Sequence, residues 1–189
     1  MDVGAGDGRW AYEQARRDPS AFYVALDPDA GALGEYALRA SRKPERGGVA
    51  NALFVVAAVE EPPPELAGFA DEVHVNFPWA ALLRGLLLPD ARVLAGIAAL
   101  AKPGALLEMV LTYDAAHDHG AGLGPAAPDL APEVIEALSQ PYAAAGIELA
   151  QPRLLSREEA LAVPSTWGRR LLHGRPRRVY VVQGAIGRL

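Results

Sequence analysis

The sequence lacks cysteine altogether and contains only two methionines among its 189 residues. The absence of cysteine excludes disulfide bonds, catalysis by a thiolate, and zinc or iron–sulfur sites with cysteine ligands. No apolar run approaches the ~20 residues of a membrane-spanning helix, and the start lacks the basic region of a secretory signal. We therefore expect a cytoplasmic protein with no membrane partner.

Basic residues are scarce in the first part of the chain, and acidic residues are scarce in the last part. Residues 1–150 carry 10 Lys and Arg against 21 Asp and Glu, whereas residues 151–189 carry 8 against 2. A basic end on an acidic body indicates a localised surface for a polyanion. A solvated, arginine-rich surface without a ligand explains the charges equally well at this point.

Alternating secondary structure occupies the first two-thirds of the chain. Short β-branched runs alternate with amphipathic stretches, which predicts an α/β fold with a mostly parallel sheet. The predicted strands are residues 22–27, 53–58, 72–77 and 106–112, with an edge or antiparallel strand at 178–184. The predicted helices are residues 9–18, 28–41, 89–101 and 132–145.

Two long loops interrupt this pattern. Residues 113–131 are rich in Gly and Pro, and residues 163–178 hold Val-Pro-Ser-Thr-Trp-Gly followed by five Arg. Hydrophobic residues make up 51% of the sequence, enough for the core of one domain. We predict a single domain over residues 1–189, with loop insertions at 113–131 and 163–178, since long loops are often functional. Asp2-Val3-Gly4 resembles the tail of a first strand that is truncated.

A glycine-rich turn follows this short first strand. Gly4, Gly6 and Gly8 let the backbone pass close to a ligand at the N-terminus of the next helix. The spacing G-x-G-x-G differs from the dinucleotide fingerprint, and there is no phosphate-binding Lys. Asp7 inside the turn repels a pyrophosphate but tolerates a cationic ligand.

Carboxylates follow the next two predicted strands. Asp27 stands about twenty residues after the glycines, where a carboxylate binds ribose hydroxyls, and Glu60 follows the third strand at the same edge of the sheet. Together these features predict a nucleoside pocket without phosphates, which fits S-adenosylmethionine. The alternative is that these residues have a purely structural role, in which the glycines form a tight turn and Asp27 caps a helix.

Two of the three tryptophans lie outside the predicted strands and helices. Trp79 ends Asn76-Phe77-Pro78-Trp79 after the predicted fourth strand, and Trp167 ends Pro164-Ser165-Thr166-Trp167. Two indoles can hold a base that is removed from its stack, at about 1–3 kcal/mol per base. Large aromatic residues are otherwise core anchors, and this is how we interpret Trp10.

Basic residues gather at two places along the chain. One cluster flanks Trp167 and consists of Arg169, Arg170, Arg175, Arg177 and Arg178. The other closes the second predicted helix and consists of Arg39, Arg42, Lys43 and Arg46. Such residues hold nucleic acid by its phosphates. The four histidines do not have metal-ligand spacing, so we expect no metal.

Several motifs together resemble one known family. They are Asp-Val-Gly-Ala-Gly-Asp-Gly-Arg, Phe-Tyr-Val-Ala-Leu-Asp-Pro, Val-Val-Ala-Ala-Val-Glu, Asn-Phe-Pro-Trp-Ala-Ala-Leu-Leu and Ser-Thr-Trp-Gly-Arg-Arg-Leu. The chain resembles the aminoglycoside-resistance 16S rRNA (adenine(1408)-N(1))-methyltransferases of the kanamycin–apramycin type. The resemblance implies a class I, Rossmann-like methyltransferase fold, with a seven-stranded, mostly parallel sheet and an antiparallel last strand.

The resemblance also implies site residues. The implied contacts to S-adenosylmethionine are Gly4, Gly6, Arg9, Asp27, Val59, Glu60, Asn76, Phe77, Pro78, Trp79, Ala80, Ala81, Ser165, Thr166 and Trp167. The implied catalytic residues are Trp79 and Trp167, which stack on the base, and Ser165. The implied rRNA contacts are Arg39, Arg42, Lys43, Arg170, Arg175 and Arg177.

The resulting hypothesis is methyl transfer to N1 of adenine 1408 in the 30S subunit by a monomer. One alternative is a related methyltransferase that acts on another RNA or a small molecule. Another is a non-catalytic module that binds the cofactor or RNA.

Overall fold

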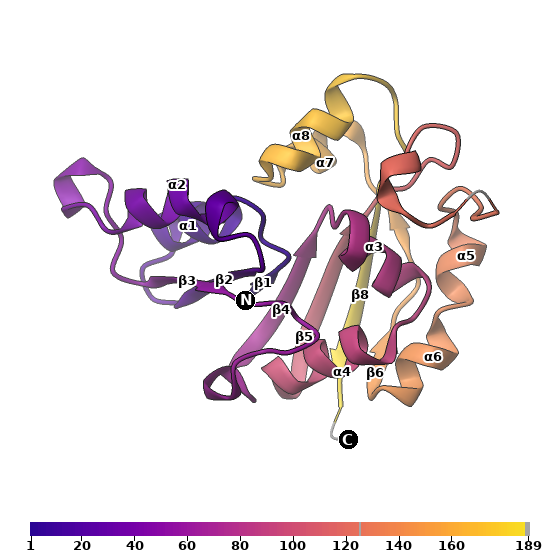
Figure 1. The fold of residues 1–189 in the computed structure, drawn as a ribbon, viewed down its shortest axis with the longest axis horizontal. Coiled ribbons are helices and arrows are strands. Elements are labelled where there is room, and N and C mark those ends of the chain that lie inside the picture. Colours follow the sequence, from indigo (N-terminus) through magenta and orange to yellow (C-terminus); the bar gives the residue numbers. More distant parts are fainter. Residues whose placement is uncertain (125, 188–189) are drawn as a thin grey trace.

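A single sheet runs through the part of the chain that the computed structural model describes, residues 1–124 and 126–187 (Figure 1). It has eight strands in these residues, in the order β3-β2-β1-β4-β5-β8-β6, with β7 paired to β8. The strands are β1 (Asp2–Val3), β2 (Tyr23–Asp27), β3 (Ala52–Val56), β4 (Ala70–Asn76), β5 (Ala101–Leu111), β6 (Ile147–Leu149), β7 (Arg153–Leu154) and β8 (Tyr180–Ile186).

Helices connect and cover these strands. The α-helices are α1 (Arg9–Arg17), α2 (Ala30–Ala40), α3 (Ala80–Leu87), α4 (Ala91–Leu100), α5 (Pro132–Glu136), α6 (Ser139–Ala144), α7 (Arg157–Ala162) and α8 (Thr166–His173). Short 3-10 turns are η1 (Pro44–Arg46), η2 (Pro64–Leu66) and η3 (His119–Ala121). None of the described helices has the length and apolar character needed to cross a bilayer.

The strand order creates a switch point at the middle of the sheet. Strands β1 to β5 pair in parallel, whereas β8 runs antiparallel to β5, β6 and β7. This confirms the predicted mostly parallel sheet with an antiparallel last strand, and β7 adds an eighth strand to the predicted seven. Strand β1 lies in the middle of the sheet, with β2 on one side and β4 on the other. The direction in which the strands are added reverses at β1. Ligands bind at such a switch point, outside the carboxyl ends of the strands.

The core holds this edge of the sheet in place. Val75 of β4 and Met109 of β5 are completely buried against Leu83 of α3 and Ile97 of α4. Burial of each such side chain contributes about 1.5–3 kcal/mol. A second apolar cluster joins α7 and α8 to β5 and β8, and Figure 1 shows both helices lying across the ends of these strands.

Several elements differ from the sequence predictions. The stretch 163–178, predicted as a loop insertion, contains α8, which begins where the side chain of Ser165 caps the helix. The predicted helix 132–145 is two helices, because Pro141 has no N–H to donate to the carbonyl of residue 137. Helices α3 and α7 and strands β6 and β7 lie where no element was predicted from the residue pattern. The remaining predicted elements agree with the structure to within a few residues, apart from β5, which begins five residues before the predicted strand.

Candidate cofactor and substrate site

The glycine turn after β1 requires glycine for two separate reasons. Gly4 and Gly6 have φ values of 69° and 57°, a region that residues with a Cβ rarely adopt. A Cβ at Gly4 would lie 2.2 Å from the Leu82 side chain. The amides of Gly4 and Ala5 donate to the Leu26 carbonyl at 2.9 and 3.1 Å. The turn is thereby held against β2 with its backbone close to the open edge of the sheet.

Asp27 braces the same turn from the end of β2. Its Oδ2 accepts a hydrogen bond from the Gly6 amide at 2.8 Å, and its Oδ1 accepts one from the Asp29 amide at 2.9 Å. A carboxylate has about four acceptor positions. Asp27 therefore has acceptor positions left for ligand hydroxyls while it shapes the turn.

Asp2 lies beneath the turn and connects β1 to β4. It is 2% exposed, and its Oδ1 accepts a hydrogen bond from the Asn76 amide at 3.0 Å. Burial raises the pKa of the Asp2 carboxyl to about 7, against the opposing effect of the Asn76 hydrogen bond. The sequence predicted Asp2 only as part of the tail of a strand. The sequence feature that could have predicted its burial is the presence of an acidic residue in an otherwise apolar strand.

The turn Asn76-Phe77-Pro78-Trp79 is strained. Phe77 and Ala80 have φ values of 51° and 47°, and such a conformation costs of the order of 1–3 kcal/mol for a residue other than glycine. The Phe77 amide donates to the Val110 carbonyl at 2.9 Å, and the Phe77 ring is buried. These contacts hold the strained turn, so the following Trp79 projects at a fixed position.

Helix α8 packs directly on this turn. Gly168 lies against the Phe77 ring, and a Cβ at position 168 would be 2.4 Å from that ring. The hydroxyl oxygen of Ser165 accepts a hydrogen bond from the Gly168 amide at 3.0 Å. Ser165 therefore begins the helix, and its hydroxyl donates no hydrogen bond within the part of the chain that the structure describes. This packing places Trp167 beside Trp79.

The two indoles touch each other. The ring centroids of Trp79 and Trp167 are 5.1 Å apart and their planes are inclined at 64°. The structure thus brings together the two tryptophans that the sequence predicted would act jointly. Because the rings are in contact, no space for a base lies between them. A planar base can enter only if the two rings separate.

These elements enclose a cavity of about 890 Å³ at the switch point of the sheet. Five carboxylates line it, namely Asp7, Asp27, Asp29, Glu35 and Glu60, together with the guanidinium of Arg170. This excess of negative charge favours a cationic ligand and disfavours a phosphate. The backbone cradle, the ribose-type carboxylate and the charge fit S-adenosylmethionine, which combines an adenosine with a sulfonium.

Most of the predicted cofactor residues line this cavity. They are Gly4, Gly6, Asp27, Val59, Glu60, Asn76, Phe77, Trp79, Ala80, Ala81, Ser165, Thr166 and Trp167. Pro78 is buried and does not line the cavity. Arg9 is also outside the lining, and its Nε forms an ion pair with Glu13 at 3.2 Å. The lining residues that sequence reasoning missed include Asp29, which caps α2, and Leu82 of α3.

The predicted rRNA contacts are in different environments. Arg177 is 7% exposed in its side chain and forms a two-pronged ion pair with Asp118, at 2.6 and 2.7 Å. This arrangement does not fit the predicted surface contact, because the guanidinium is engaged inside the protein. Arg39 pairs with Glu35 at 2.6 Å and lies over the Tyr36 ring.

The other predicted rRNA contacts lie at the surface. Arg42, Lys43, Arg170 and Arg175 are exposed. Across the described residues there is no cluster of three or more His, Asp and Glu side chains suited to a metal ion.

Replacing Gly168 by alanine tests the packing of α8. The new Cβ collides with Phe77, so Gly168→Ala lowers the free energy of unfolding by about 1–3 kcal/mol, measured by chemical denaturation. Gly34→Ala is the matched control, since Gly34 is also helical and a Cβ added there would meet no atom within 4 Å. The control leaves the stability unchanged or slightly higher. Equal stability of both variants would contradict the close contact.

Replacing Asp2 by asparagine tests the buried carboxyl. The pKa of Asp2 is raised to about 7 in the folded protein and is about 3.9 in an unfolded chain. The folded state therefore holds an extra proton between these values, and stability falls as the pH rises from about 4 to 7. The stability of the wild type relative to Asp2→Asn falls over the same pH range. A difference independent of pH would contradict the assignment.

Comparison with known proteins agrees with this site. Residues 1–186 match the family model NpmA, described as 16S rRNA (adenine(1408)-N(1))-methyltransferase. A relative of that name from Streptoalloteichus tenebrarius is 38% identical over 177 residues, covering 94% of this chain and 81% of the relative. Another from Escherichia coli is 33% identical over 192 residues, covering 100% of this chain and 87% of the relative.

A solved structure resembles the fold as well as the sequence. It is a variant of the 16S rRNA (adenine(1408)-N(1))-methyltransferase from Catenulisporales acidiphilia, with cosubstrate SAM. The TM-score is 0.90 at 38% identity, and the match covers 99% of this chain and 84% of the other. The chain described here belongs to the 16S rRNA (adenine(1408)-N(1))-methyltransferase family.

Proposed function

We propose that this protein transfers a methyl group from S-adenosylmethionine to N1 of adenine 1408 of 16S rRNA in the 30S subunit, and so confers aminoglycoside resistance. The observation that carries the proposal is the pair of indoles at the mouth of an acidic, glycine-cradled cavity. An aromatic pair can stack on a flat base, and the carboxylates attract a cationic methyl donor. Membership of the family supplies the target.

Different residues of the cavity bind different parts of the cofactor. Gly4 and Gly6 allow close approach of the backbone, and Asp27 accepts hydrogen bonds from ribose hydroxyls. The carboxylate of Glu60 adds negative charge to the same cavity. The bound cofactor supplies an electrophilic methyl group on a positively charged sulfur.

The protein has no need to remove a proton from the target before transfer. N1 of adenine already carries a lone pair in the plane of the ring. The task that remains is positioning, in which the base leaves its stack and is clamped with N1 toward the methyl donor. Trp79 and Trp167 do the clamping, and the Ser165 hydroxyl orients the bound groups. We assign no general base.

Mapping of the methylated nucleotide tests the target. Purified 30S subunits are incubated with the enzyme and cofactor, and the 16S rRNA is copied by reverse transcriptase. Because N1 methylation blocks base pairing, we expect a strong stop next to adenine 1408. Cofactor binding measured by calorimetry, together with no stop at this adenine, would refute the target. A stop elsewhere would identify a related enzyme for a different site.

Substitution of the indoles tests the clamp. Trp79→Ala and Trp167→Ala each reduce the rate of methyl transfer at saturating cofactor about 10- to 100-fold, since each removes stacking of about 1–3 kcal/mol. Phenylalanine at either position restores part of the rate. Trp10→Phe is the control, since Trp10 is buried against His74, with ring centroids 4.5 Å apart. Full activity of both alanine variants would rule out the clamp.

A further inference from the structure

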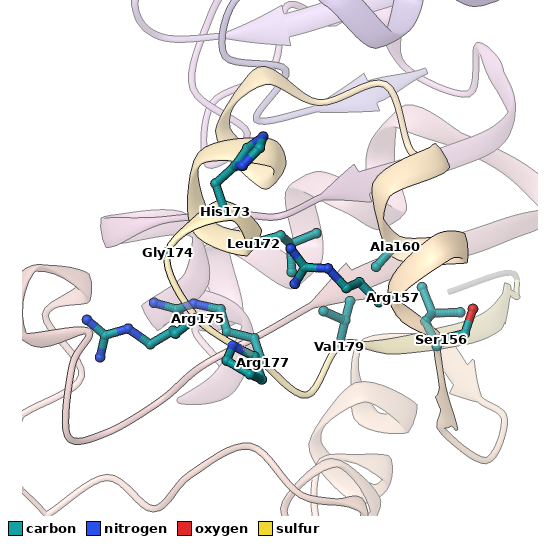
Figure 2. Close-up of a pocket in the computed structure, with 11 residues that line it drawn as sticks. Ser156, Arg157, Ala160, Leu172, His173, Gly174, Arg175, Arg177 and Val179 are labelled. Carbon is teal, nitrogen blue, oxygen red and sulfur yellow. The ribbon is translucent and has the colours of Figure 1, made fainter.

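A second cavity lies beyond α8, separate from the cofactor site. It has a volume of about 460 Å³ and lies between α7, α8 and the turn at residues 174–177 (Figure 2). Its lining consists of Leu155, Ser156, Arg157, Ala160, Leu172, His173, Gly174, Arg175, Pro176, Arg177 and Val179. None of these residues lines the cofactor cavity.

The lining has an apolar part and a basic part. Ala160, Leu172 and Val179 are buried side chains of the second apolar cluster. Arg157 and Arg175 are exposed at the edge of the cavity. Figure 2 shows the Arg157 side chain reaching from α7 toward Leu172 on α8. An apolar floor beside guanidinium groups suits a ligand with one flat apolar part and one phosphate.

The two arginines at the edge are available to such a ligand. Within residues 1–124 and 126–187, no carboxylate lies within ion-pair distance of Arg157 or Arg175. In contrast, the neighbouring Arg153 is paired with Glu159 at 2.7 Å, and Arg177 is paired with Asp118. Glu159, which lies on α7 like Arg157, also accepts a hydrogen bond from the Ser156 amide. Its carboxylate is therefore occupied at the start of its own helix.

Helix α8 connects this cavity to the aromatic pair. Trp167 and Arg170 of α8 line the cofactor cavity, whereas Leu172 and His173 of the same helix line the second one. His173 lies six positions after Trp167 on this helix, a distance of about 9 Å along the axis. An RNA strand that places a base at Trp167 therefore brings its flanking nucleotides within reach of the second cavity.

We infer that this cavity is a subsite for one nucleotide of the rRNA that flanks the target adenine. Arg157 and Arg175 hold its phosphate, and its base or ribose lies on the apolar floor formed by Ala160, Leu172 and Val179. The subsite rests on the proposed function, because it needs the rRNA as substrate. It adds Arg157 and α7 to the surface that recognises the 30S subunit.

Two variants that each lose one positive charge, at nearby positions, test the subsite. Arg157→Ala removes a guanidinium of the cavity, whereas Arg153→Ala removes one that is already paired and lies outside it. We expect Arg157→Ala to raise KM for 30S subunits about tenfold with kcat changed less than twofold. It also lowers the slope of log KM against log salt by about one. Arg153→Ala changes neither quantity. Both variants bind S-adenosylmethionine like the wild type.

A neutral substitution tests the floor. Ala160→Val fills part of the cavity without a change in charge, and it raises KM for 30S subunits while cofactor affinity is retained.

Identical KM values for Arg157→Ala and Arg153→Ala would overturn the subsite, while the methylation of adenine 1408 by the wild type would still stand. Failure of the wild type to methylate 30S subunits would overturn the proposed function itself. Micromolar binding of free AMP that depends on Arg157 would identify a free-nucleotide site and overturn the assignment to rRNA.

Discussion

The close packing of α8 on the strained turn after β4 is the constraint on which the site depends. Phe77 adopts a positive φ, is held by the end of β5, and presents its ring to Gly168. The same contact therefore sets the positions of Trp79 and Trp167, which belong to segments almost ninety residues apart in the sequence. Strain of this kind persists only where the surrounding structure imposes it, and it is concentrated at functional sites.

Charge is distributed to suit two ligands of opposite sign. The cofactor cavity is lined by carboxylates, whereas the C-terminal segment that crosses its mouth is basic. Arg170 stands at the boundary between the two, since it lines the cavity and is exposed. The acidic body thus accommodates a sulfonium. We propose that the basic segment attracts the phosphate backbone of the rRNA, since such attraction dominates affinity for nucleic acids.

Local patterns predicted the parts of the fold that depend on local physics. The glycine turn, Asp27 and the parallel strands follow from spacing and hydrophobic alternation. Helix α8 escaped prediction, because Pro164, Gly168 and Gly174 are typical of loops, and the need for Gly168 arises only from Phe77, far away in the sequence. The ion pair between Arg177 and Asp118 was missed for the same reason. The direct contact of the two indoles required the tertiary structure.

We propose that Trp79 and Trp167, which touch in this structure, separate to hold the target base. A cryo-electron microscopy structure of the protein on the 30S subunit, with S-adenosylhomocysteine bound, tests this most directly. We predict that adenine 1408 lies outside its helix between the two indoles, with N1 toward the cofactor sulfur. Indoles still in mutual contact, with the adenine stacked in its helix or held by other residues, would contradict the account.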